Sequence, residues 1–93
     1  MSNDSSQSVS RNRFEFKEDG ETAYLEFDVE GHAWMTLWHT EVPPPLRGRG
    51  IAGTLAQTAF EYAREHHMKV DVICPLALDY VQKHPEFRDL IEK

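Results

Sequence analysis

The chain has a single cysteine, few basic side chains and no long apolar run. Cys74 stands alone among 93 residues, so no disulfide can form within the chain, and this cysteine usage fits a reducing compartment. Nowhere do 18 apolar residues follow one another, which excludes a membrane-spanning helix. The first residues also lack the apolar stretch of a secretory signal. We therefore expect an intracellular, cytoplasmic protein with no membrane partner.

Positive charge is scarce, because 10 Lys and Arg residues stand against 16 Asp and Glu residues, for a formal net charge of −6. Such an acidic surface repels phosphate backbones, so no nucleic-acid partner is expected. The histidines lack metal-ligand spacing, since His66 and His67 are adjacent and no i, i+4 pair accompanies a carboxylate. No metal site is expected either, and an anionic ligand would need a local exception to the acidic field.

Alternating apolar and polar side chains predict a three-stranded antiparallel meander. The strands are expected over residues 13–17, 23–30 and 33–42, with tight turns at Asp19-Gly20 and Glu30-Gly31. Residues 1–12 are almost free of apolar side chains and are expected to be a disordered tail. The folded domain is therefore expected to span residues 13–93.

After the meander the periodicity becomes helical, from Gly50 to about His66. A β-branched run at residues 69–73 predicts a fourth strand, parallel to the third because a helix intervenes. Pro75 suits the first position of a second helix, whose buried face is expected to carry Leu76, Ala77, Tyr80 and Val81. The β-β-β-α-β-α order predicts an α/β (α+β) fold with a mostly antiparallel, mixed sheet.

A proline run and a glycine-rich turn join the third strand to the first helix. Pro43-Pro44-Pro45 is expected to leave the sheet in an extended conformation. In Arg47-Gly48-Arg49-Gly50, the glycines permit close approach of a phosphate, and the unpaired N–H groups of the helix start favour an anion. The turn predicts a pyrophosphate site, although a plain surface loop explains it equally well. It is neither a Walker loop nor a dinucleotide fingerprint, since neither pattern is complete.

Several motifs together resemble a known family. Arg47-Gly48-Arg49-Gly50-Ile51-Ala52 resembles the Arg/Gln-x-x-Gly-x-Gly/Ala signature of the GNAT superfamily of N-acetyltransferases. With the segment from His39 to Pro44, the pair Cys74-Pro75, and Tyr80 followed by His84-Pro85-Glu86-Phe87, the chain is similar to minimal single-domain GNAT-like acetyltransferases of about 90 to 110 residues. The resemblance covers Phe14 to Leu90.

The resemblance implies a minimal GNAT-like fold and an acetyl-CoA-dependent N-acetyltransferase with an unidentified amine acceptor. The third and fourth strands would splay, the third would hold the pantetheine arm of coenzyme A (CoA), and the turn's N–H groups from Leu46 to Ala52 would hold the pyrophosphate. The implied cofactor-binding residues are Trp38, Thr40, Glu41, Val42, Leu46, Arg47, Gly48, Arg49, Gly50, Ile51, Ala52 and, for a CoA phosphate, Lys83.

The chain departs from larger relatives in one respect. They carry two helices after the first strand that wall the acceptor site, where this chain has a short turn. An open acceptor pocket, or one completed by a partner, is therefore expected. An acyl-CoA-binding module, acting as a sensor or carrier with little transfer, is the alternative function. The acceptor and the oligomeric state are left open.

His39 and Cys74 are the expected catalytic residues, because the resemblance to the minimal GNAT-like acetyltransferases extends to both positions and implies active-site roles for them. An imidazole accepts a proton near neutral pH, and a helix N-terminus favours a thiolate. Two mechanisms stay open: direct attack of the amine with His39 as base, which we prefer, or transient acetylation of Cys74. Alternatively, Cys74 is a buried residue with only a structural role. Tyr80 is a secondary candidate for the general acid, unless its ring packs inward.

Overall fold

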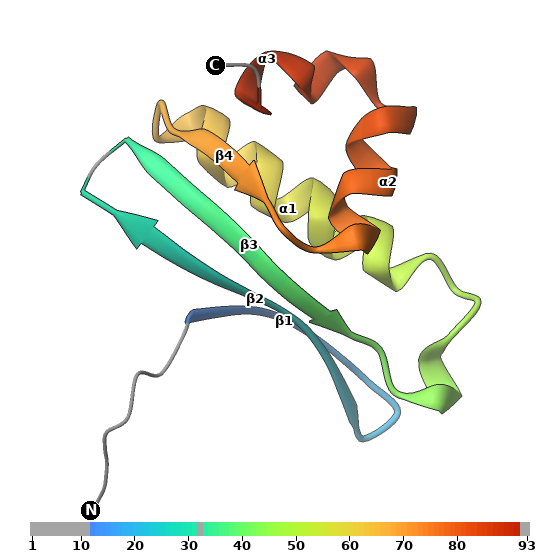
Figure 1. The fold of residues 1–93 in the computed structure, drawn as a ribbon. Helices are drawn as coiled ribbons and strands as arrows, with labels where there is room; N and C mark the ends of the chain where they lie inside the picture. The colour runs from blue at the N-terminus through green and yellow to red at the C-terminus, as the bar shows by residue number, and fades with distance from the viewer. Residues whose placement is uncertain (1–11, 32, 92–93) are drawn as a thin grey trace, which may run out of the picture.

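The computed structural model describes residues 12–31 and 33–91. The elements follow in the order β1 (Asn12–Glu18), β2 (Glu21–Glu30), β3 (Trp34–Glu41), η1 (Pro44–Leu46), α1 (Ile51–Glu65), β4 (Lys69–Val72), α2 (Pro75–Lys83), η2 (Pro85–Phe87) and α3 (Arg88–Ile91) (Figure 1). One sheet of order β1-β2-β3-β4 is antiparallel except for the parallel pair β3–β4. The predicted α+β architecture and mixed sheet are confirmed.

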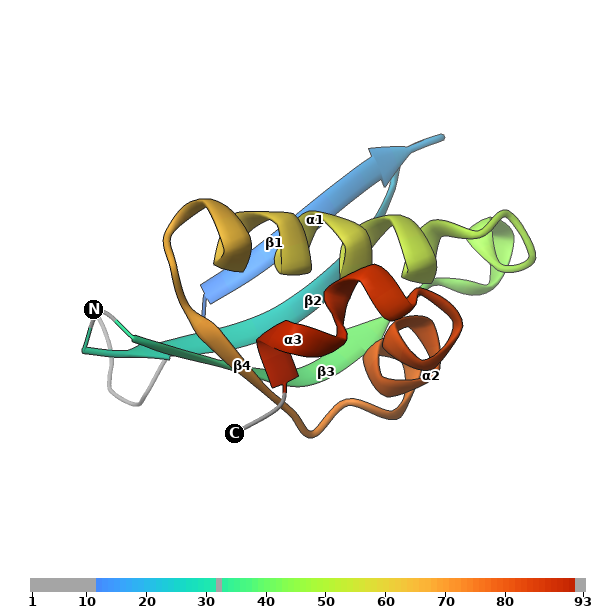
Figure 2. The same cartoon turned by 90° about the horizontal axis from the view of Figure 1, so that it is seen from above.

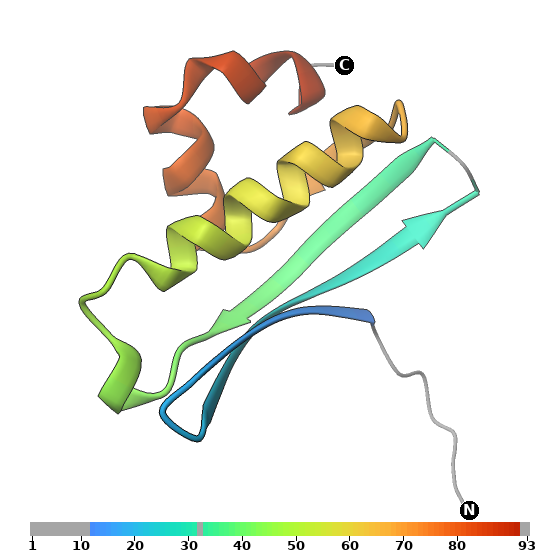
Figure 3. The same ribbon diagram turned by 180° about the vertical axis from the view of Figure 1, so that it is seen from behind.

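The three helices cover one face of the sheet. Figure 2 shows β2 and β3 beneath α1, while β1 crosses α1 in this view and ends above it, and Figure 3 shows α1 lying across the near face with α2 and α3 beside it. Strand residues Leu25, Met35 and Leu37 and helix residue Phe60 are fully buried between these layers, and each such side chain stabilises the fold by roughly 1.5–3 kcal/mol. None of the helices in the described ranges is long and apolar enough to cross a bilayer.

The other side of the sheet is called the open face below. It carries the strand residues that alternate with the buried ones. In β2, alternate residues such as Tyr24 and Asp28 point away from the buried row. In β3, Trp34 and Thr36 do the same, and Asp71 of β4 lies in register with Thr36. The open face is thus polar and aromatic, as expected for an antiparallel sheet with one solvated side.

A β-bulge interrupts the pairing of β2 with β3. Phe27 pairs with Leu37 and Glu26 pairs with His39, so Trp38 is an extra residue in β3. Because side chains alternate with a period of two, one extra residue reverses which face each later side chain meets. Leu37 is buried before the bulge; after it, His39 is exposed and Thr40 is buried.

β3 and β4 separate at their C-terminal ends. Their parallel pairing runs from Trp34 opposite Lys69 to Leu37 opposite Val72, where it ends. The Leu37 carbonyl accepts the N–H groups of both Ile73 (2.9 Å) and Cys74 (3.0 Å), and the chain then turns into α2. Among the described residues, the rest of β3, from Trp38 to Glu41, does not pair with β4. This confirms the predicted splay.

Three local predictions need correction. Asn12, assigned to the tail, begins β1, while residues 1–11 lie outside the described part of the chain. The proline run does not stay extended, because Pro44–Leu46 forms a 3₁₀ turn, which the fixed proline φ permits. Leu76, assigned to a buried face, is 48% exposed, whereas Phe60, which was not assigned, lies in the core.

The C-terminal helix is tied to α1 by Arg64, and this tie should be sensitive to acid. Arg64 Nη2 lies 3.0 Å from Asp89 Oδ1, and its hydrogen bond lowers the pKa of Asp89, outweighing the effect of burial. Because the pKa of Asp89 is lower in the folded than in the unfolded protein, the ionised carboxylate adds to the free energy of unfolding at pH values above 3.8, its ordinary pKa. This contribution is lost as the pH falls through the folded-state pKa. Between pH 5 and about pH 2, the melting temperature should therefore fall more steeply for the wild type than for the Asp89→Asn variant.

Asp79→Asn is the matched control for this experiment. It removes an exposed pair within one helix, Asp79 Oδ2 to Lys83 Nζ at 3.1 Å, and should keep the acid profile of the wild type. Superimposable melting profiles for the wild type and Asp89→Asn would show that the tie between α1 and α3 adds no stability.

Candidate functional site

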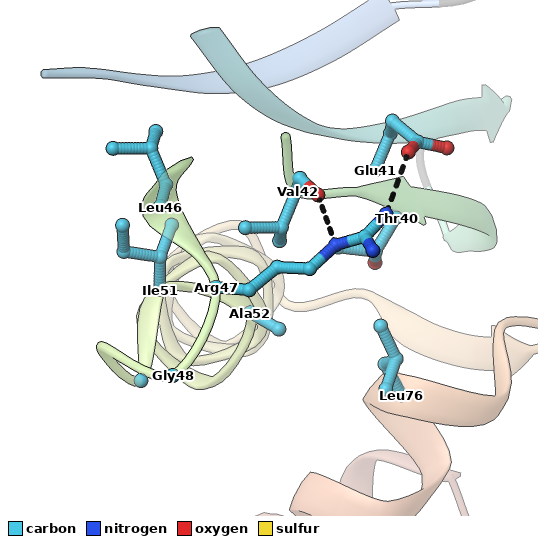
Figure 4. Close-up of a pocket in the computed structure, with 10 residues that line it drawn as sticks. Thr40, Glu41, Val42, Leu46, Arg47, Gly48, Ile51, Ala52 and Leu76 are labelled. Carbon is cyan, nitrogen blue, oxygen red and sulfur yellow. Dashed lines mark hydrogen bonds and ion pairs between the residues drawn. The ribbon is translucent and has the colours of Figure 1, made fainter. Parts of the chain in front are cut away.

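A pocket of about 390 Å³ opens where the end of β3, the glycine turn and the start of α1 face α2 (Figure 4). The lining residues come from these four segments: Thr40, Glu41, Val42, Leu46, Arg47, Gly48, Gly50, Ile51, Ala52 and Leu76. The strand end and the glycine turn, which the sequence assigned to one site, therefore surround one cavity. Leu76 was missed as a lining residue because its helical spacing suggested the core.

The N-terminus of α1 presents peptide N–H groups to this region. The first intrahelical bond runs from the Thr54 N–H to the Gly50 carbonyl at 3.1 Å, and no side chain of the described residues caps the helix. The N–H groups of residues 51–53 therefore precede the helical ladder. Those of residues 48–50 also bond to no other backbone group within the described ranges. Six consecutive N–H groups at the positive end of a helix make a favourable anion site.

Gly48 and Gly50 hold this turn in a left-handed conformation. Their φ angles are +83° and +76°, and a Cβ on either residue would meet nothing within 4 Å. Glycine is required there by the backbone angle and not by crowding inside the protein. Both residues line the pocket, so a side chain at either position would enter the space that a ligand needs.

The N–H groups of Leu46 and Arg47 do not belong to the donor set. Leu46 donates to the Pro43 carbonyl (2.9 Å) and Arg47 to the Pro44 carbonyl (3.2 Å). The predicted donor segment from Leu46 to Ala52 is therefore wrong at its first two residues, because the proline run folds into a 3₁₀ turn that uses these groups. Leu46 contributes a fully buried side chain to the pocket wall instead.

The two arginines of the turn point in different directions. Arg47 Nε donates to the Val42 carbonyl at 2.9 Å, its Nη2 lies 3.9 Å from Glu41 Oε2, and its side chain lines the pocket (Figure 4). Arg49 instead pairs with Glu18 and Asp19 at the β1–β2 turn. The structure therefore places Arg47 at the site and uses Arg49 to anchor the glycine turn to the first hairpin.

Trp38 and His39 lie on the open face. Trp38 Nε1 donates to Asp28 Oδ2 at 2.8 Å. His39 Nε2 lies 3.1 Å from Glu41 Oε1, its ring meets that of Tyr24 edge-on at 6.3 Å, and its side chain is 53% exposed. The bulge therefore leaves the imidazole accessible to solvent, on the face away from the helices.

Cys74 is buried and contacts Thr40. The residue is 1% exposed, and its Sγ lies 3.1 Å from Thr40 Oγ1. Thr40 is itself buried but lines the pocket. The structure thus brings Thr40 and Cys74 together and places His39 on the opposite face of β3. The Thr40 contact was missed because the sequence carries no sign of the bulge that turns this side chain inward.

Tyr80 packs its ring inward. It stacks on His84 at 4.0 Å and on Phe60 at 6.2 Å between ring centroids. Burial, followed by the charges of Glu86 and Glu61, raises the pKa of Tyr80, so the phenol stays protonated at neutral pH. The residue remains able to donate a proton, but its ring belongs to the aromatic packing between α1 and α2.

Lys83 is not part of the pocket lining. Its Nζ pairs with Asp79 one helical turn earlier at 3.1 Å, and the side chain is 71% exposed. Within residues 12–31 and 33–91, no three His, Cys, Asp or Glu side chains are grouped as metal ligands.

Comparison with known proteins adds the family. Residues 13–90 match the family described as GCN5-related N-acetyl-transferase. The chain is 35% identical over 77 residues to Protein NATD1 of Xenopus tropicalis, an alignment that spans 81% of this chain and 71% of that protein. It is 38% identical over 63 residues to Protein NATD1 of Homo sapiens, spanning 68% and 56% of the two chains. For Protein NATD1 of Danio rerio, the identity is 32% over 85 residues, spanning 87% and 77%. The splayed strands, the glycine turn and α1 all fall within the matched region, and the chain belongs to the GCN5-related N-acetyltransferase family.

Proposed function

We propose that this protein is an acetyl-CoA-dependent N-acetyltransferase that acts on a primary amine. One observation carries the proposal: N–H groups 48–53, which have no backbone partner among the described residues, lie beside a pocket that continues to the end of β3, where β4 no longer pairs with it. A helix start with unpaired N–H groups, next to a strand edge that β4 leaves open, would match the two recognition elements of CoA, its pyrophosphate and its amide-bearing arm. Membership of the family supports acetyl transfer as the reaction.

The described residues fit the parts of CoA. The N–H groups at the start of α1 would bind the pyrophosphate oxygens, and the Arg47 guanidinium lies beside them as the nearby cation. The peptide groups at the end of β3, around Thr40 to Val42, would pair with the pantetheine amides as an added strand does. Leu76 and Val42 supply apolar walls for the aliphatic part of the arm.

Acetyl-CoA supplies the acetyl group as a thioester. Transfer forms a C–N bond and breaks the C–S bond, and the acceptor ammonium loses two protons, one to solvent and one to the CoA sulfur. His39, exposed on the open face and oriented by Glu41, would accept the first proton. Thr40 lines the pocket and its hydroxyl contacts the Cys74 thiol; this hydroxyl would hydrogen-bond to the departing sulfur.

Direct transfer is favoured over an acetyl-Cys74 intermediate. A nucleophile must reach the reacting carbon at about 3–3.5 Å, whereas Cys74 is 1% exposed and is not among the residues that line the pocket. In the direct route, Cys74 needs only to position Thr40.

A binding module without transfer is the second candidate, and the open face favours it. In the described part of the chain no helix covers His39, so an acceptor is not enclosed. The same pocket would then bind an acyl-CoA that is sensed or carried and not consumed.

Titration of the protein with CoA, followed by backbone amide NMR shifts, tests the binding step. The largest changes should fall on residues 48–53 and on Thr40 to Val42. Changes confined to other surfaces would overturn the proposed site. Release of free CoA thiol from acetyl-CoA in the presence of amines then separates the two candidates, because a binding module shows the shifts without turnover.

A further inference from the structure

Glu41 lies between the pocket and the imidazole on the open face. It lines the pocket, and its Oε1 lies 3.1 Å from His39 Nε2. Its other oxygen, Oε2, lies 3.9 Å from Arg47 Nη2, an ion pair that Figure 4 shows at the pocket. One carboxylate therefore contacts the proposed base with one oxygen and the proposed phosphate-binding cation with the other.

The contact with His39 selects one form of its ring. An ionised carboxylate can only accept a hydrogen bond, so the neutral imidazole must carry its hydrogen on Nε2 and donate it to Glu41. Nδ1 then holds the lone pair that can take a proton from the amine. The side chain of His39 is 53% exposed, so an amine can approach the ring from solvent. Glu41 thus decides which of the two ring nitrogens accepts the proton.

The contact with Arg47 has the opposite consequence for CoA. A phosphate group must compete with Glu41 for the guanidinium of Arg47, and the carboxylate places a negative charge in the lining of a pocket proposed to bind an anion. Both side chains are largely exposed, so water screens the pair and the competition lowers the affinity only by a small factor. Arg47 Nε also donates to the Val42 carbonyl, so the guanidinium stays at the pocket when the carboxylate is removed.

We propose that Glu41 is a positioning residue with two opposed effects: it keeps Nδ1 of His39 as the proton acceptor, and it weakens CoA binding through Arg47. This inference rests on the proposed transferase function. In this scheme Glu41 contacts neither the acetyl group nor the amine and acts on the reaction through the imidazole. An acidic side chain is unfavourable in the lining of an anion pocket, and its contact with His39 explains what it contributes there.

Glu41→Gln tests both effects in one variant, because it removes the charge and keeps the shape of the side chain. Calorimetric titration should show CoA bound about threefold more tightly. The kcat for acetyl transfer should fall by about tenfold with the KM for the amine unchanged, because a glutamine amide can either accept from the ring or donate to it and no longer fixes the tautomer. If Glu41 only supported the fold, the CoA affinity and kcat would fall together.

The tautomer is measured without acetyl-CoA, from the nitrogen NMR shifts of the neutral His39 ring. The wild type should carry its hydrogen on Nε2, and Glu41→Gln should show a mixture of the two forms. Glu26→Gln is the matched control. Glu26 stands opposite His39 in register and loses the same charge, but its carboxylate pairs with Arg13 at 3.4 Å. This variant should leave the tautomer, the CoA affinity and kcat unchanged.

Combining the variants tests whether Glu41 acts through the imidazole. In a His39→Ala background, Glu41→Gln should cause no further loss of kcat, whereas another loss of about tenfold would show that Glu41 acts without His39. A wild-type ring protonated on Nδ1, or an unchanged or weaker CoA affinity in Glu41→Gln, would also overturn the proposal. If acetyl transfer and the CoA shifts at residues 48–53 persist in those cases, the proposed function stands and only the role of Glu41 fails.

Discussion

Gly50→Val is expected to weaken CoA binding by at least about thirtyfold, or about 2 kcal/mol, whereas Gly20→Val leaves it unchanged. The two glycines have nearly equal φ angles, +76° and +74°, and a Cβ on either one meets nothing within 4 Å. Both substitutions therefore impose similar backbone strain, of the order of 1–2 kcal/mol or more for a β-branched residue. Only Gly50 lines the pocket, so only there do the side chain and the altered turn disturb ligand binding.

Calorimetric titration with CoA and thermal unfolding of both variants measure the two effects separately. Similar losses of stability with different affinities are the expected outcome. Equal affinities would show that the glycine turn does not hold CoA. If valine prevents folding, Gly48→Ala and Gly20→Ala give the same comparison at smaller strain, because Gly48 also lines the pocket with φ +83°.

His39→Ala is expected to lower kcat by about 10²- to 10⁴-fold, the range for loss of a general base, without changing the affinity for CoA. The side chain is exposed on the open face and takes no part in the pocket lining, so cofactor binding should not depend on it. Because the site is open to solvent, added imidazole should restore part of the rate. Acetyl transfer at saturating acetyl-CoA measures both effects.

Two control variants accompany this measurement. His66→Ala alters a histidine at the other end of α1, about 22 Å from the pocket at the rise of a 15-residue helix, and should leave kcat unchanged. Cys74→Ala should keep kcat within about tenfold and lower stability by about 1 kcal/mol, since it removes a buried contact with Thr40. A loss for Cys74→Ala as large as that for His39→Ala, with CoA binding intact, would instead favour an acetyl-Cys74 intermediate.

The helices and strands can be predicted from the sequence because the spacing of their apolar residues is regular. Ala23, Leu25 and Phe27 alternate with polar residues, and all three are buried. The helical period from Ile51 and the β-branched run at Val70 to Val72 were equally plain. The glycine turn was assigned from its residue types alone, and its two pocket-facing glycines have the positive φ that such a turn requires.

The parts that were not readable depend on long-range contacts. Large apolar side chains occur at even-numbered positions of β3 (Trp34 and Trp38) and at odd-numbered positions (Met35 and Leu37). The sequence therefore shows no break in the alternation that would mark the bulge. Arg49 resembles Arg47 in sequence, yet its direction is set by carboxylates at the β1–β2 turn, more than 25 residues away. Local composition cannot distinguish two such arginines.

The extra residue in β3 bears on the kinetics of the proposed reaction. Since the faces reverse at Trp38, Thr40 serves the pocket while its neighbour His39 serves the open face. Donor and acceptor would then approach from opposite sides of the sheet and would meet at the gap where β3 and β4 separate, without competing for the same volume. Both could be present at once in a ternary complex, so initial-rate plots should show the intersecting lines of a sequential mechanism and not the parallel lines of a ping-pong scheme.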